Sequence, residues 1–226
     1  MDRLGLPYET QGIFITNVLS HLFLCIPVYQ LISRKWTLEA CIHCFGVISS
    51  FMYHLVQAAQ FENGPPFHME EIQWHFLDNI AALACFGVWF TYLAAFRDPF
   101  VDYWVKVLSI LFSIVVQVPH PWDLSYTFGP LIMFTLLPVA TCCHKVFIQK
   151  QSFSSVYDAR EVMVGGGFLI GALIFFLLGL DDPNDPYRIF HGAWHVCGSF
   201  ASLRLWRSVK DPVANVWVKA EESLWI

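Results

Sequence analysis

The chain has 226 residues, of which 56% are hydrophobic and only 14% are charged. Soluble domains carry about 25% charged residues, so this composition excludes an ordinary soluble protein and indicates a membrane protein. The formal net charge of −5, without any basic stripe in the sequence, also excludes a nucleic-acid-binding protein.

Apolar windows of about 20 residues predict membrane-spanning helices. In chain order these windows are 11–33, 36–60, 75–96, 103–119, 124–143, 161–180 and 189–208. We therefore expect an all-α membrane protein, a seven-transmembrane helix bundle over residues 11–208. A short segment at 1–10 precedes the bundle, and a tail at 209–226 follows it.

The positive charges predict the orientation of this bundle. When the loops are assigned to alternate sides, eleven lysines and arginines fall on one side, and only Arg3 and Arg188 fall on the other. Because cytoplasmic loops carry the excess of positive charge, we expect the N-terminus outside and the C-terminal tail in the cytosol. The expected location is the plasma membrane or a membrane of the secretory pathway, and the oligomeric state stays open.

The first two predicted spans contain polar residues that we interpret as structural. His21 lies in the middle of the first span without a recognisable partner pattern, and we interpret it as a packing residue. Cys41-x-x-Cys44, with His43 between the two cysteines, has the spacing of half a metal site. Because no second half accompanies it, we expect a structural role there.

Other polar residues within the spans predict a functional site, because ionisable groups in membrane helices usually face the bundle interior and serve function. Ser50 and His54 lie four residues apart in the second span, as do His191 and His195 in the seventh, and Asp78 opens the third. Residues at this spacing share one face of a helix. With the N-terminus outside, all of them except Ser50 fall near the outer leaflet.

This set of residue types predicts a metal site. Three histidines and one carboxylate at one level form the donor set of a catalytic zinc with an open position for water. The alternative for each motif alone stays open: the histidine pair could bond to neighbouring helices, and Asp78 could lie at the aqueous interface. Gly192 and Ala193, between the two histidines, would let a neighbouring helix approach closely.

The order of these motifs resembles the CREST superfamily of seven-span membrane hydrolases. The resemblance rests on Ser50 to His54, then Asp78, then His191 to His195, and it extends from the second span to the seventh. Within the superfamily, four stretches are most similar to transmembrane protein 8 and myomaker. They are S-S-F-M-Y-H at 49–54, G-V-W-F-T-Y at 87–92, F-G-P at 128–130 and Y-R-I-F-H-G-A-W-H at 187–195.

The resemblance implies that His54, His191 and His195 bind Zn²⁺, with Ser50 and Asp78 beside the metal. In hydrolysis, Asp78 would act as general base, and Ser50 would donate a hydrogen bond to the developing oxyanion or orient the water. The resemblance implies hydrolysis of an acyl ester or amide in a phospholipid, a GPI lipid or a related lipid of the bilayer. It also leaves two alternatives without enzymatic activity. One is a myomaker-like membrane remodelling or fusion protein with a structural zinc site, and the other is a lipid-sensing receptor of the same superfamily.

Overall fold

The computed structural model of the protein describes residues 11–59, 66–119, 123–180 and 184–211. Its helices are η1 (Phe14–Val18), α2 (His21–Ser33), α3 (Thr37–Ala58), η2 (Pro66–His68), α4 (Glu71–Leu93), α5 (Pro99–Gln117), α6 (Leu124–Cys143), η3 (His144–Ile148), α7 (Phe153–Val156), α8 (Ala159–Leu178) and α9 (Ile189–Leu205). Within these ranges no strand forms, and the predicted all-α class is confirmed. The predicted N-terminal segment 1–10 and the tail from residue 212 onward lie outside the described residues.

Six helical stretches are long and apolar enough to cross a membrane. They are Gln11–Ser33, Thr37–Ala58, Glu71–Leu93, Pro99–Gln117, Leu124–Ile148 and Ala159–Leu178. Each corresponds to one of the first six predicted windows, so the chain is a multi-pass helical membrane protein. The seventh window contains α9, which has 17 residues and is shorter than these six.

The outer surface of the helices is apolar, as lipid contact requires. Large hydrophobic side chains are exposed on several helices, including Leu22 at 68%, Leu108 at 59%, Ile132 at 60% and Ile170 at 64%. These four residues belong to α2, α5, α6 and α8, so the apolar surface continues around the molecule. Lipid tails can cover such a surface without cost, whereas water cannot.

Polar residues immediately before several helices define where those helices begin. The carboxylates of Asp98, Asp123 and Asp158 accept hydrogen bonds from the first backbone N–H groups of α5, α6 and α8. At the start of α4, Glu70 and Gln73 form a reciprocal capping box. Because the first N–H groups of a helix lack partners within it, such caps stabilise each start by about 1 kcal/mol.

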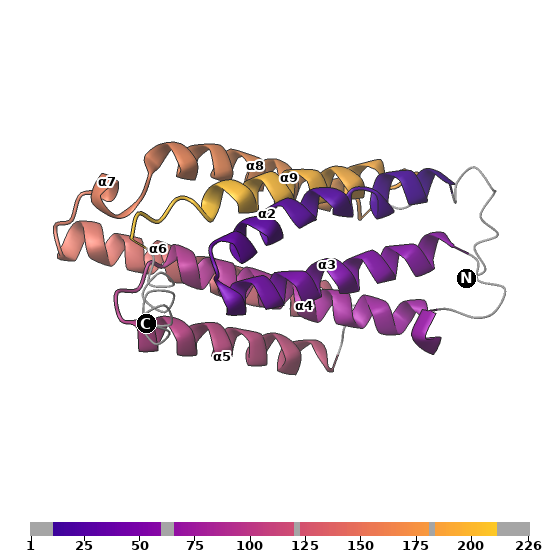
Figure 1. Ribbon diagram of the computed structural model, residues 1–226, viewed down its shortest axis with the longest axis horizontal. Helices are drawn as coiled ribbons and strands as arrows, with labels where there is room; N and C mark the ends of the chain where they lie inside the picture. The colour runs from indigo at the N-terminus through magenta and orange to yellow at the C-terminus, as the bar shows by residue number, and fades with distance from the viewer. Residues whose placement is uncertain (1–10, 60–65, 120–122, 181–183, 212–226) are drawn as a thin grey trace.

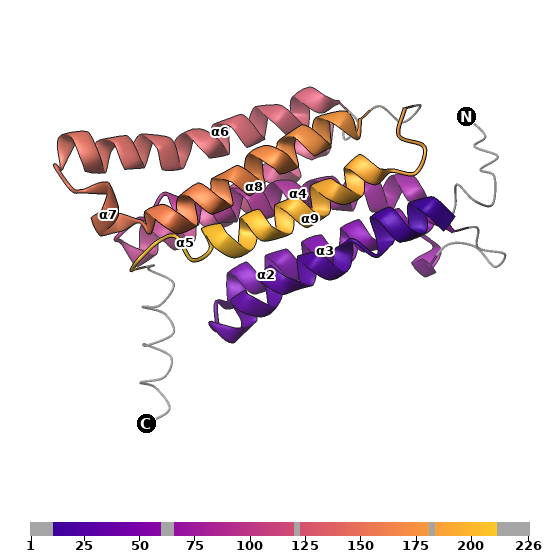
Figure 2. The same cartoon turned by 90° about the horizontal axis from the view of Figure 1, so that it is seen from above.

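The helices run side by side along the long axis of the molecule (Figure 1). The most extensive pairings are α8 with α9, α3 with α4, and α4 with α5. Helix α2 packs against both α9 and α3, while α6 packs mainly on α4. Viewed from above, α9 lies between α8 and α2 (Figure 2). Helices α2, α3 and α9 are therefore close enough to contribute to one site.

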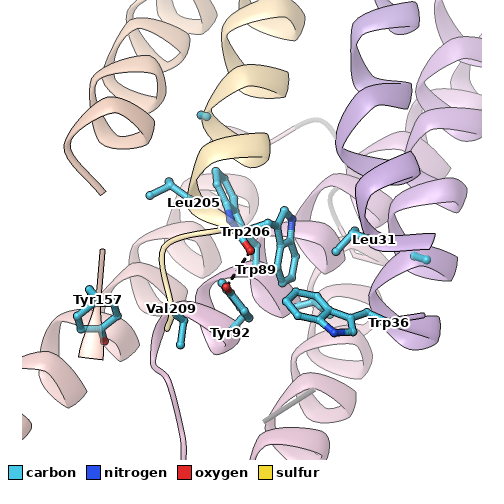
Figure 3. Packing of buried hydrophobic residues seen from close by; sticks show 11 residues of the cluster. Leu31, Trp36, Trp89, Tyr92, Tyr157, Leu205, Trp206 and Val209 are labelled. Atoms are coloured by element: carbon cyan, nitrogen blue, oxygen red, sulfur yellow. Dashed lines mark hydrogen bonds between the residues drawn. The ribbon is translucent and has the colours of Figure 1, made fainter. Parts of the chain in front are cut away.

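An aromatic core fills the end of the bundle where α2, α4 and α9 terminate. Trp36, Tyr92 and Trp206 are almost completely buried there, and their rings contact one another (Figure 3). The Tyr92 hydroxyl donates a hydrogen bond of 2.9 Å to the Trp206 carbonyl oxygen, and Arg34 donates another to the same oxygen. Aromatic packing and hydrogen bonding together fix the relative positions of these helix ends.

A buried ion triad links α3 to α5 near this core. The Lys106 ammonium group lies 2.6 Å from a carboxylate oxygen of Glu39 and 2.6 Å from one of Asp102. All three side chains are buried. Lys106 and Lys145 are among the eleven positive charges that predicted the orientation, and Lys145 donates to the carbonyl oxygens of Ala94 and Ala95. Both cations are thus bound within the protein.

Candidate metal centre

The start of α9 positions its two histidines. The Asp185 carboxylate accepts hydrogen bonds of 2.8 and 2.9 Å from the backbone N–H groups of Ile189 and Phe190. Arg188, just before the helix, adopts a left-handed conformation with φ of 54°, which turns the chain into α9. From this fixed start, His191 and His195 lie one turn apart, and their ring centroids are 4.8 Å apart.

Helix α3 brings His54 to the same place. His54 is 2% exposed, and its ring centroid lies 4.7 Å from that of His191 and 5.2 Å from that of His195. The Nε2 atoms of His54 and His191 are 3.1 Å apart. On its other side, the His54 ring has its Nδ1 atom 3.2 Å from the Gln57 Oε1 atom. The structure therefore brings together the three histidines on which the zinc prediction rests.

A fourth histidine, His21 at the start of α2, joins this cluster. Its ring centroid lies 4.4 Å from that of His195 and 5.4 Å from that of His54, and the side chain is 2% exposed. Potential ligand atoms of His21, His54 and His195 all lie within 4.8 Å of one another. The interpretation of His21 as an isolated packing residue does not agree with this arrangement.

Hydrogen bonds around Asn17 and Ser20 orient the His21 and His195 rings, and the Asn17 Nδ2 atom also lies 3.3 Å from the His54 Nδ1 atom. The Nδ1 atom of His21 lies 2.7 Å from the Asn17 carbonyl oxygen and donates to it. Ser20 donates to the same carbonyl at 2.6 Å, and its oxygen lies 2.8 Å from Nδ1 of His195. Because the Ser20 hydroxyl donates its proton to the Asn17 carbonyl oxygen, the Ser20 oxygen accepts a hydrogen bond from the Nδ1–H group of His195. Both imidazoles consequently carry their proton on Nδ1 and keep a lone pair on Nε2.

The Ser50 and Asp78 side chains lie next to each other, where α3 packs against α4. Ser50 is 8% exposed and lies one helical turn from His54. The two residues predicted for chemistry are thus neighbours, and one turn of α3 connects Ser50 to the histidine cluster.

This donor set fits a divalent transition metal. Two nitrogens bound to one tetrahedral zinc at about 2.0–2.1 Å lie about 3.3 Å apart, close to the 3.1 Å between His54 and His191. The His21 Nε2 atom is buried and has no hydrogen-bond partner among the described residues. Zinc-bound histidines commonly donate their other ring nitrogen to a carbonyl or hydroxyl oxygen, as His21 and His195 do. The residues present therefore suit Zn²⁺.

The sequence contains one signal that could have identified His21. Asn17 and His21 are four residues apart in the first span, and an amide and an imidazole on one face of a membrane helix are uncommon without a role. The predicted spans place His21 in the middle of the first helix and His191 near the start of the last, so the two histidines are expected at different depths. This expectation ignores the shift of one helix along another, which is decided by how the helices pack.

Two comparisons with known proteins bear on this centre. No curated protein matches the chain. The family described as "Protein of unknown function (DUF3522)" matches residues 12–196, a range that contains all four histidines, Ser50 and Asp78. Since this range covers most of the 226 residues, the chain belongs to the DUF3522 family.

Proposed function

We propose that the protein is a zinc-dependent hydrolase of membrane lipids that cleaves an acyl ester or amide bond. The observation that carries the proposal is the Ser50–Asp78 pair, a hydroxyl next to a carboxyl group, with Ser50 one helical turn from the buried His54. A carboxyl group in this part of the bundle supplies a proton acceptor where hydrolysis needs one.

The proposal includes a seventh span formed by α9, with the N-terminus outside and the C-terminus in the cytosol. At 1.5 Å per residue, the 17 residues of α9 extend about 25 Å, a little less than the hydrocarbon core. Helix α9 packs against both α8 and α2, so it needs fewer apolar residues than a lipid-exposed helix. The distribution of lysines and arginines supports the orientation.

Each residue of the site has a chemical role in this proposal. A zinc ion held by His54, His191 and His195 would supply Lewis acidity and lower the pKa of water toward about 7. Asp78 would take the proton of the attacking water as general base and return it to the leaving group. Ser50 would donate its single hydroxyl proton to the developing oxyanion or orient the attacking water.

The substrate class follows from where the site lies. The histidines are carried by α2, α3 and α9, three helices of the apolar bundle, so a lipid can approach from the bilayer. In the proposed orientation the site lies at the outer leaflet. A phospholipid, a GPI lipid or a related acylated lipid has its ester or amide bonds at this depth, between headgroup and hydrocarbon.

One observation favours a second candidate, a membrane-remodelling protein of the myomaker kind whose metal site is structural. Structural zinc has four protein ligands, and His21 adds a fourth histidine to the cluster. The two candidates share the metal and differ in whether a bond is cleaved.

Lipid hydrolysis by purified protein in phospholipid vesicles tests the proposal. We expect Asp78→Asn to lower the release of fatty acid by about 100-fold or more, with the bound zinc retained. Ser50→Ala should also lower the rate, and Ser49→Ala is its matched control. Ser49 is the adjacent buried serine, and its hydroxyl donates only within its own helix, to Phe45 and Gly46.

The same assay can reject the proposal. If the wild-type protein contains zinc but releases no fatty acid from phospholipid, GPI lipid or ceramide, the hydrolase function is wrong and the structural candidate gains support. If Ser49→Ala and Ser50→Ala lower the rate equally, the assigned role of Ser50 is wrong.

A further inference from the structure

We propose that His21 is a fourth ligand of the metal centre, so that α2 closes the site that α3 and α9 form. This inference rests on the proposed zinc centre. It adds a ligand on α2, a helix that carries none of the sequence motifs. It concerns metal binding alone and does not depend on whether the centre hydrolyses a lipid.

The first argument is the state of the His21 ring. Its Nδ1 proton is donated to the Asn17 carbonyl oxygen at 2.7 Å, which leaves the lone pair on Nε2. That Nε2 atom is buried and has no hydrogen-bond partner among the described residues. Burying a polar atom without a partner costs free energy. A metal ion shared with His54 and His195 would remove this cost.

His43 provides an internal comparison, because its local bonding is the same. Its Nδ1 atom lies 2.9 Å from the carbonyl oxygen of Glu39, also four residues earlier in the chain. The His43 ring, however, packs edge-on against Trp206, with centroids 5.5 Å apart. A hydrogen bond to its own helix therefore does not by itself bring a histidine close to other potential metal ligands. The proximity of His21 to His54 and His195 is an additional feature of the fold.

The second argument is that α2 is tied to α9 on both sides of His21. Ser20 contacts His195 directly. One turn earlier, a Cβ atom at Gly192 would collide with the Thr16 carbonyl oxygen, so only glycine permits this approach. Beyond His21, the Ser199 hydroxyl donates to the carbonyl oxygen of Phe23. These contacts hold the His21 ring at a fixed position over the cluster.

A short π-helix supports the same placement. Residues Phe14–Val18 form η1, directly before α2, and this stretch includes Asn17. Single π-helical turns widen a helix locally and occur frequently at functional sites. Here the widened turn directs the Asn17 carbonyl oxygen toward both His21 and Ser20. The N-terminal span is thus shaped to present an imidazole to the centre.

A fourth imidazole changes what the centre can do. Four nitrogens would complete a tetrahedral coordination sphere. In the hydrolase, water would therefore have to enter as a fifth ligand, an expansion that catalytic zinc sites allow. In the structural candidate, His21 would stay bound and the centre would fasten α2 to α3 and α9.

Cobalt spectroscopy of the full-length protein in detergent tests the proposal directly. The protein is stripped of metal and loaded with Co²⁺ alone, and its spectrum is compared with that of His21→Cys prepared in the same way. A thiolate bound to Co²⁺ gives an intense sulfur-to-metal charge-transfer band in the near ultraviolet. We expect this band in His21→Cys and not in the wild type, which carries only its seven natural cysteines.

Zinc titration of His21→Ala gives a second measurement. The loss of a ligand should raise the Kd for zinc about 10–100-fold or more, whereas His43→Ala should leave it unchanged. The proposal is overturned if His21→Cys shows no charge-transfer band while it still binds Co²⁺, or if His21→Ala binds zinc as tightly as the wild type. Neither result bears on lipid hydrolysis, which the Asp78→Asn assay measures separately.

Discussion

At one end of α3, the Lys106 ammonium group lies 2.6 Å from both Glu39 and Asp102, so its charge is matched within the fold. Near the other end, about 22 Å away along the helix, His54 lies in a cluster where the His21 Nε2 atom has no partner among the described residues. Both regions bury polar groups, and in the first the cation and both carboxylates satisfy one another. In the second, the proposed metal would supply the partner that the His21 ring lacks.

The neighbourhood of each region strengthens this contrast. Around the ion triad, Trp36, Tyr92 and Trp206 pack closely, and the Trp206 carbonyl oxygen accepts two hydrogen bonds. Around the histidines, the hydrogen bonds of Asn17 and Ser20 fix the orientation of the imidazole rings. Packing and ion pairs hold the first region together, whereas hydrogen bonds to the imidazole rings organise the second.

The largest effect should come from breaking the ion triad. Lys106→Met leaves two buried carboxylates without their cation, and we expect a loss of about 3–5 kcal/mol in the free energy of unfolding. Denaturation in detergent, followed by circular dichroism, measures the change. Zinc binding by the fraction that remains folded should be unaffected.

A triple variant is the control for this experiment. Lys106→Met combined with Glu39→Gln and Asp102→Asn removes the charges together, so much of the stability should return. If Lys106→Met alone unfolds no more easily than the wild type, the triad does not stabilise the fold and the contrast between the two ends fails.

A smaller effect should follow from separating α2 and α9 at the histidine end. Gly192→Ala forces the Thr16 carbonyl oxygen away from α9, and overpacking of this kind costs about 1–3 kcal/mol. Because η1 and α2 would shift with it, zinc affinity should fall as well. Thermal denaturation and zinc titration measure the two effects.

Gly198→Ala is the matched control, since Gly198 lies on the same helix and a Cβ there meets nothing within 4 Å. It should leave both stability and zinc affinity close to those of the wild type. Equal zinc affinities of Gly192→Ala and the wild type would mean that the close approach of α2 does not contribute to the metal site.

The smallest effect belongs to the aromatic core. Tyr92→Phe removes the 2.9 Å hydrogen bond to the Trp206 carbonyl oxygen and should cost about 1 kcal/mol, because Arg34 still donates to that oxygen. Thermal stability measures the change, and Tyr29→Phe, at a tyrosine that is 73% exposed, should have no effect. A change in zinc affinity with Tyr92→Phe would show that the two ends of the bundle are coupled and do not act independently.

The prediction of close packing at Gly192 is confirmed, since the Thr16 backbone occupies the space of its missing side chain. Small residues between two polar residues of a helix are visible in the sequence, so this feature could be predicted locally. The segment that packs against Gly192 could not be predicted from the sequence. The segment is η1, at the far end of the chain, and its identity depends on how α2 crosses α9.

The sequence by itself determined the helical class, the six membrane-spanning stretches and the identity of three of the clustered histidines. Runs of apolar residues and spacings of four are local properties, and a helix converts them into length and faces without help from the rest of the chain. Only the tertiary structure decided that the potential ligand atoms of His21 lie with those of His54 and His195, and that Lys106 is matched by Glu39 and Asp102. Both arrangements depend on how far packed helices slide along one another, which side-chain packing between helices sets and no single helix encodes.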